Sequence, residues 1–134
     1  MTKRSRVLLI VTSSLLLAAL ACGGSISTAN IGDAWMSFDL NGEQKTDVFS
    51  QDDIFYAQVD LRNAPDDTSL KAVWTAVNVA DTEPDFLINE TEFTTGSGPI
   101  HFDLSNTSLW PTGSYKVDIF LNDELSQTLE FAVQ

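Results

Sequence analysis

Few residues in this sequence have the types and spacing that catalysis needs. His101 is the one histidine, and it stands between Ile100 and Phe102 in an alternating run, which predicts a solvent-facing strand position. Ser97 lies in Gly96-Ser97-Gly98, which has the composition of a turn and lacks the strand–turn–helix setting of a hydrolase serine. A catalytic pair of nucleophile and base would have to be built from this single imidazole. We therefore expect no enzyme.

A metal site has one weak candidate. Asp81, Glu83 and Asp85 place three carboxylates at alternate positions of a predicted loop, and calcium prefers oxygen ligands of this kind. The glycine and closing glutamate of an EF-hand are missing, and Pro84 restricts the loop. Zinc has no cysteine–histidine set to bind it. No metal and no cofactor are expected, and calcium at these three residues stays an open question.

The single cysteine, Cys22, ends an apolar segment. The chain starts with Lys3, Arg4 and Arg6 and continues as a charge-free run of 15 residues over 7–21. A membrane-spanning helix needs about 20 apolar residues, so this run has the length of a signal-peptide core. With only one cysteine, an internal disulfide is impossible.

The residues 19–22, Ala-Leu-Ala-Cys, resemble the bacterial lipobox, with alanine in place of the commoner leucine at the first position. The resemblance implies a signal peptide at 1–21, lipid on Cys22 and a protein anchored to a cell membrane or outer membrane on its extracytoplasmic side. The small and polar residues that follow predict a flexible tether over 22–32. The alternatives are secretory cleavage near Ala21 and an uncleaved membrane helix.

Charge is distributed unevenly along the chain. All 19 acids lie from Asp33 onward, where only Lys45, Arg62, Lys71 and Lys116 are basic, so this part carries 4 − 19 = −15. Such a surface repels phosphate backbones, and a nucleic-acid partner is not expected. An acidic domain also has no affinity of its own for a bilayer, whereas two acyl chains give stable anchoring.

Residues 33–134 predict a single all-β domain. Short runs with a period of two alternate with turn residues, as in 54–61, 70–79, 100–104 and 115–121. Two shorter strands are expected at 86–88 and 92–94, and Asn41-Gly42 predicts a tight hairpin. About seven strands with regular turns fit a two-sheet antiparallel sandwich in which Trp74 is a core residue.

One stretch adds a resemblance to a known fold. Residues 110–117 read Trp-Pro-Thr-Gly-Ser-Tyr-Lys-Val, and they resemble the entry to strand F of an immunoglobulin-like domain. The resemblance implies a tyrosine corner at Tyr115, whose hydroxyl bonds to upstream backbone. Val117 stands where antibody domains have their second cysteine, so the likeness is to fibronectin-III-like and other bacterial immunoglobulin-like modules that lack the disulfide.

Aromatic residues are the remaining candidates for a binding surface. The candidates for partial exposure are Trp35, Tyr56, Phe86, Trp110 and Phe120. Of these, Trp35, Trp110 and Phe120 form the possible binding surface, and Phe120 falls on the polar face of its strand. Packing under loops is the competing interpretation. The leading hypothesis is a non-enzymatic binding or protein-interaction module. The alternatives are a glycan-binding module that uses these aromatics, and a structural or assembly component of an envelope complex.

Overall fold

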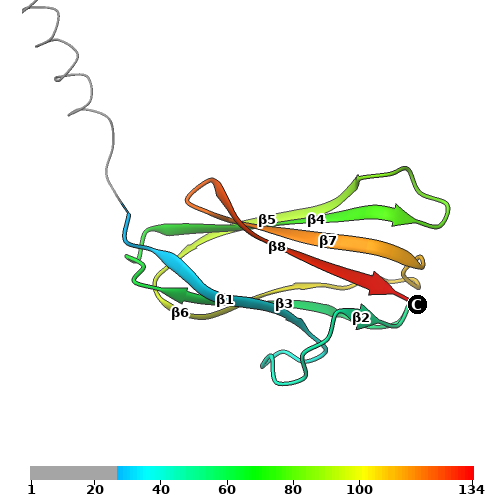
Figure 1. The fold of residues 1–134 in the computed structure, drawn as a ribbon, viewed down its shortest axis with the longest axis horizontal. Coiled ribbons are helices and arrows are strands. Elements are labelled where there is room, and N and C mark those ends of the chain that lie inside the picture. The colour runs from blue at the N-terminus through cyan, green and yellow to red at the C-terminus, as the bar shows by residue number, and fades with distance from the viewer. Residues whose placement is uncertain (1–26) are drawn as a thin grey trace, which may run out of the picture.

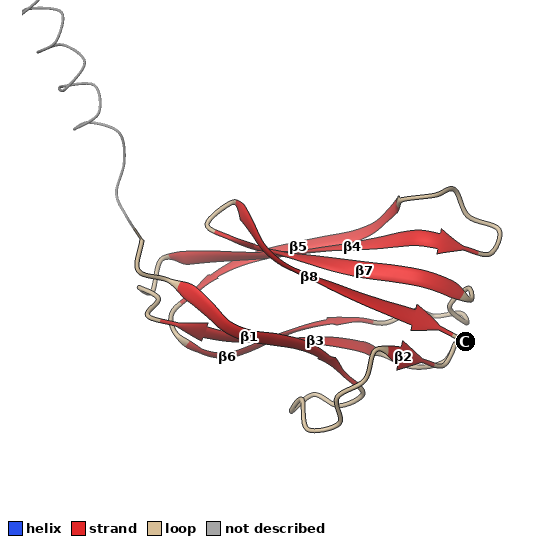
Figure 2. Ribbon diagram, in the orientation of Figure 1, coloured by secondary structure: helices blue, strands red, loops and turns tan. Residues whose placement is uncertain are grey.

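The computed structural model describes residues 27–134, and these form two β-sheets packed face to face (Figures 1 and 2). The three-stranded sheet has the order β1-β3-β6, and the five-stranded sheet has the order β2-β8-β7-β4-β5. The eight strands are β1 (Asn30–Ser37), β2 (Val48–Phe49), β3 (Phe55–Arg62), β4 (Thr68–Val79), β5 (Phe86–Thr95), β6 (Gly98–Leu104), β7 (Gly113–Leu121) and β8 (Glu124–Val133). The predicted two-sheet all-β sandwich is confirmed.

Two details of the predicted strands are wrong. Strand β2, at Val48–Phe49, was not expected, and it pairs with β8 in parallel, so the sandwich is not wholly antiparallel. A strand of two residues has no alternation to detect. Strand β5 is one strand of 10 residues instead of two short ones. Its pairing with β4 shifts at Trp74/Thr75, and because this bulge interrupts the alternation, the sequence pattern indicates two separate strands.

The tight hairpin predicted at Asn41-Gly42 is replaced by a longer loop, residues 38–45, which folds over β3. The Gly42 amide donates to the carbonyl of Asp39 at 3.2 Å, so the glycine is the last residue of its turn instead of a central one. Beneath the loop, the Gln58 amide nitrogen donates to the carbonyls of Asp39 and Leu40 at 3.2 and 3.0 Å. These bonds satisfy a polar side chain that the loop buries.

The core consists of the inward faces of both sheets and is dominated by aromatic rings. Phe55 lies at its centre, with ring centroids 4.6 Å from Trp110 and 4.8 Å from Phe131. Trp74 is 1% exposed, which confirms it as a core residue. Complete burial of side chains of this size stabilises the fold by roughly 1.5–3 kcal/mol each.

The tyrosine corner has the geometry that the resemblance implies. The Tyr115 hydroxyl donates to the carbonyl of Pro111 at 2.5 Å. Gly113 makes this turn possible, since a Cβ there would lie 2.3 Å from the carbonyl oxygen of Asn78. Burial raises the pKa of the Tyr115 phenol above its usual value of about 10. The corner therefore fixes the β6–β7 connection against the end of β4.

The chain enters the domain at the end that holds the β3–β4 and β7–β8 turns. Strand β1 begins at Asn30, three residues before the predicted domain start at 33, because Asn30 pairs with Arg62 of β3. The Ser27 hydroxyl accepts a hydrogen bond from Asn122 at 3.3 Å. Within residues 27–134, no helix is long and apolar enough to cross a membrane.

Candidate functional site

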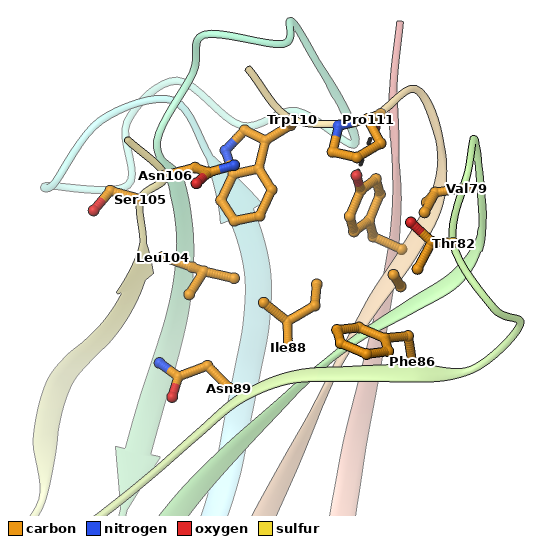
Figure 3. A pocket seen from close by; sticks show the side chains of 12 residues that line it. Val79, Thr82, Phe86, Ile88, Asn89, Leu104, Ser105, Asn106, Trp110 and Pro111 are labelled. Atoms are coloured by element: carbon orange, nitrogen blue, oxygen red, sulfur yellow. Dashed lines mark hydrogen bonds between the residues drawn. The ribbon is translucent and has the colours of Figure 1, made fainter. Parts of the chain in front are cut away.

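A cavity of about 380 Å³ opens at the opposite end of the domain, where β5 borders one sheet and β6 borders the other (Figure 3). Its inner wall is apolar and is built by Ala76, Ile88, Leu104, Trp110 and Tyr115. Binding pockets for small molecules occupy about 300–1,000 Å³, so this one suits a small ligand or a single side chain.

The mouth of the cavity is polar. Thr82 comes from the β4–β5 loop, Asn89 from β5, and Ser105 and Asn106 from the segment after β6 (Figure 3). Hydroxyl and amide side chains at the rim of an apolar pocket can orient a ligand whose apolar part lies inside. The cavity thus combines an apolar interior with uncharged hydrogen-bonding groups at its mouth.

Exposed apolar side chains lie beside this mouth. Phe86 and Leu87, the first two residues of β5, are 50% and 54% exposed, and Leu109 of the β6–β7 loop is 63% exposed. Phe86 also lines the cavity. Large apolar groups left in water around a pocket are typical of an interaction surface.

The loops at this end are acidic. Residues 50–54 contain Asp52 and Asp53, and residues 80–85 contain Asp81, Glu83 and Asp85, with no lysine or arginine in either loop. The four basic residues of the described part are Lys45, Arg62, Lys71 and Lys116, and none of them lines the cavity. The potential around the cavity is therefore negative, which favours cationic over anionic ligands.

The structure places Trp110 in the core, 6% exposed, and not on the surface where we expected it. Its indole N–H donates to the carbonyl of Asp53 at 3.0 Å, and its backbone N–H donates to the carbonyl of Gln51 at 2.8 Å. The β2–β3 loop thus holds the polar edge of the indole. One face of the ring stacks on Phe55, and the residue forms part of the cavity wall.

Trp35 and Phe120 lie on different sheets and are half-buried. The Trp35 indole N–H donates to the carbonyl of Gly42 at 2.9 Å, and the Lys45 ammonium lies 4.3 Å from the ring centroid. Phe120 is on the outer face of the five-stranded sheet, with the Lys71 ammonium 4.7 Å from its ring. Trp35, Trp110 and Phe120 therefore do not form one flat aromatic platform.

The remaining candidate residues are separate from one another. His101 is exposed on β6, and the Ser97 hydroxyl accepts a hydrogen bond from the Ala64 amide at 2.7 Å within its turn. In residues 27–134, no group of three or more histidine, cysteine or acidic side chains is arranged to hold a metal ion, and this includes the acids of residues 81–85. Cys22, the signal peptide at 1–21 and residues 22–26 of the tether lie outside the described residues.

Comparison with known proteins supports the fold. No protein-family model matches the chain, and no curated protein is similar enough to count as a relative. Among solved structures, an immunoglobulin-like protein from Pseudomonas aeruginosa matches with a TM-score of 0.53 at 17% sequence identity, over 83% of this chain and 100% of the other. The domain therefore has an immunoglobulin-like fold, as the residues around Tyr115 predicted.

The chain also matches parts of two larger proteins of known structure. An alkylpurine DNA glycosylase from Pseudomonas fluorescens, bound to DNA containing an abasic-site analogue, has a TM-score of 0.53 at 13% identity, over 81% of this chain and 31% of that one. A beta-glucosidase from Listeria innocua has a TM-score of 0.50 at 14% identity, over 83% of this chain and 17% of that one. At these identities the likeness concerns the fold alone, which hosts many functions.

Proposed function

We propose that this protein is a lipid-anchored, non-enzymatic binding module that holds its ligand at the end cavity. The observation that supports the proposal is the cavity itself, with its apolar wall, its polar mouth and the exposed Phe86 and Leu87 beside it. Within residues 27–134 the side chains with catalytic potential, His101 and Ser97, lie apart from it. The residues that line the cavity include no histidine, cysteine or charged side chain, so it offers mainly binding contacts.

The position of the cavity suits a molecule tethered through Cys22. The described chain begins at Ser27, beside Asn122 in the β7–β8 turn. The cavity lies at the other end of β7, a strand of 9 residues, which spans about 30 Å. A lipid on Cys22 would thus attach the chain at the end far from the cavity, and a flexible tether would leave the cavity accessible to a partner.

The binding site can be tested in intact cells by photocrosslinking. The photoreactive residue p-benzoylphenylalanine replaces Phe86 at the cavity, and in a matched control it replaces Leu125 on β8, which is 57% exposed. We expect a defined adduct from position 86 and not from position 125. The adduct should weaken when Ala76→Val narrows the cavity. Equal adducts from both positions, or none from position 86, would contradict the proposed site.

The anchor can be tested separately. Cys22→Ser removes the sulfur that would carry the lipid, so metabolic labelling with a fatty-acid analogue should be lost. Ser25→Ala, in the tether, is the control and should keep the label. Labelling that persists in Cys22→Ser would reject the lipobox, whatever the behaviour of the cavity.

A further inference from the structure

We propose that the ligand is an extended peptide segment with basic and apolar side chains, which pairs with β5 as an added strand and places one apolar side chain in the cavity. This inference rests on the proposed binding function, because it identifies the occupant of the same site. Three observations carry it: the free edge of β5, the register of its side chains relative to the cavity, and the charges that line it.

Strand β5 is the last strand of its sheet, so within the described residues one side of its backbone has no strand partner. It is 10 residues long and contains neither proline nor glycine. Other edges are interrupted: β6 carries Pro99, the pairing of β1 shifts between Ile31 and Asp33, and β8 has a bulge beside Leu125 and is paired by β2 at Ala132 and Val133. Proline, bulges and short strands protect sheet edges from further pairing, and β5 has only its one bulge near the cavity.

The register of β5 brings an added strand to the cavity. Asn89 pairs with Trp74, and Phe93 pairs with Leu70, so both point toward the core side of the sheet. Phe93 meets Phe102 of β6 with ring centroids 5.2 Å apart, which closes that half of the gap between the sheets. At the other half, Ile88 and Asn89 line the open cavity. One inward side chain of an added strand would therefore lie at its mouth.

Charges along the outer face of β5 select a basic strand. Glu90 and Glu92 pair with Val73 and Lys71 on that face, and both are exposed. Lys71 lies 3.6 Å from Glu90 and offsets part of its charge, while Glu92 accepts a hydrogen bond from Ser69. Basic side chains opposite these glutamates are favoured, because cross-strand pairs of opposite charge stabilise a sheet and like charges destabilise it.

The same charges disfavour pairing between two copies of this chain. An antiparallel β5–β5 contact centred on Thr91 would set Glu90 of one copy against Glu92 of the other. The described part carries 4 − 19 = −15, so repulsion between copies extends over the whole surface. A partner of opposite charge meets neither obstacle.

The test uses the full lipoprotein in phosphatidylcholine nanodiscs and a fluorescent synthetic peptide in which lysine and valine alternate. Fluorescence anisotropy should report saturable binding that weakens with added salt, and empty nanodiscs should give none. In two further peptides the backbone amide nitrogens are methylated, in one peptide at every lysine and in the other at every valine. Because alternate amides of a strand point to opposite edges, one of the two should bind about tenfold or more weakly than the other. Equal binding of the two methylated peptides would overturn strand addition.

Variants of the protein test the charges and the cavity. The double variant Glu90→Gln, Glu92→Gln should weaken peptide binding by about tenfold, whereas Glu43→Gln, Glu124→Gln, with the same change in net charge away from β5, should not. Ala76→Val should weaken binding of the valine peptide, with folding checked by circular dichroism. Equal effects of both double variants would mean that only net charge matters and would overturn the proposed placement on β5.

Failure of this inference can be told apart from failure of the proposed function. If the peptides do not bind but position 86 still gives its adduct in cells, the cavity binds something other than a basic strand and the inference is wrong alone. If position 86 gives no adduct, the proposed site fails and the inference fails with it.

Discussion

The two long sides of the sandwich, where the edges of the two sheets approach each other, differ in how they are closed. On the side of β1, β2 and β8, Phe49 is 1% exposed, and its ring meets those of Phe38, Phe55 and Phe131 at centroid distances of 5.0–5.5 Å. On the side of β5 and β6, Phe86 is 50% exposed and lies at an open cavity. The same residue type closes one side and leaves the other open.

The difference comes from where the chain crosses between the sheets. Residues 38–49 run from β1 of one sheet to β2 of the other along the first side, and they bring Phe49 with them. On the second side the crossing is the short link between β5 and β6 at Gly96 and Ser97, at the end where the described chain begins (Figure 1). At the far half of that side the β6–β7 segment crosses between the sheets, and its residues Ser105, Asn106 and Trp110 line the cavity without filling it.

The largest effect on stability is expected from truncating the two phenylalanines, one on each side of the sandwich. Phe49→Ala should lower the free energy of unfolding by about 3–5 kcal/mol, because it removes a fully buried ring and leaves a void. Phe86→Ala should cost less than about 1 kcal/mol, since half of its surface is already in water. Urea unfolding of both variants measures the difference. Equal losses would mean that the second side is as tightly packed as the first.

Tyr115→Phe tests the corner that forms the deep wall of the cavity. The change keeps the ring and removes the hydrogen bond to Pro111, so stability should fall by roughly 1–3 kcal/mol at neutral pH. No measurable change in urea unfolding would show that the hydroxyl does not support the corner.

The pH dependence of the same variant gives a second readout. The folded state holds the Tyr115 proton more tightly than the unfolded state, because burial raises the pKa of the phenol above about 10. The contribution of this group to the free energy of unfolding is complete below the unfolded-state pKa of about 10, and it is lost as pH rises through the raised pKa of the folded state. Wild-type protein should therefore lose more stability than Tyr115→Phe between about pH 9 and pH 11.

Two alanines on one face of β4 compare the packed core with the cavity wall. Ala72 is fully buried opposite Ile119, whereas Ala76, also buried at 3% exposure, lines the cavity. Ala72→Val should lower stability by about 1–2 kcal/mol through overpacking. Ala76→Val should stay within about 0.5 kcal/mol of wild type, because the added methyl groups enter open space. Thermal unfolding of the pair measures this, and similar losses would indicate that the cavity is too narrow to accept them.

The sequence predicts the elements of this fold better than its site. Strands β3 and β7 show alternation because Phe55, Ala57 and Tyr115, Val117 face one core while their neighbours face water. Trp110 does not follow such a pattern: it lies in a loop, and its burial depends on Phe55 and on the carbonyl of Asp53. Contacts of this kind, between segments far apart in the chain, cannot be detected in a local pattern.

The cavity was missed for the same reason. Its wall comes from four separate segments, represented by Ala76, Ile88, Leu104 and Trp110. The first three are locally consistent with ordinary core positions, and Trp110 lies in a loop. The adjacent apolar pair Phe86-Leu87, at the start of β5, departs from alternation, and the sequence does mark Phe86 as a candidate for partial exposure, which its exposed fraction of 50% confirms. The void exists because no segment fills the space between these four.

The smallest predicted effect concerns the loop on the closed side. The hydrogen bond from the Gln44 amide to the Asp39 carboxylate, at 2.9 Å, lowers the pKa of Asp39; burial opposes this shift, and the Glu43 amide adds to it. A lowered pKa stabilises the folded state above the usual aspartate pKa, and this contribution is lost as pH falls through the folded value. Asp39→Asn should therefore reduce stability slightly at neutral pH and lose less of it on acidification than wild type does.

Urea unfolding at about pH 7 and pH 3 measures this effect, with the exposed Glu124→Gln on β8 as a control for the loss of one charge. The same acidification should leave peptide binding to Asp39→Asn and to wild type equally changed, because the loop lies on the other side of the sandwich from β5. A selective loss of binding in Asp39→Asn would show that the closed and open sides are coupled through the core. The two sides would then differ in how they are packed without being energetically independent.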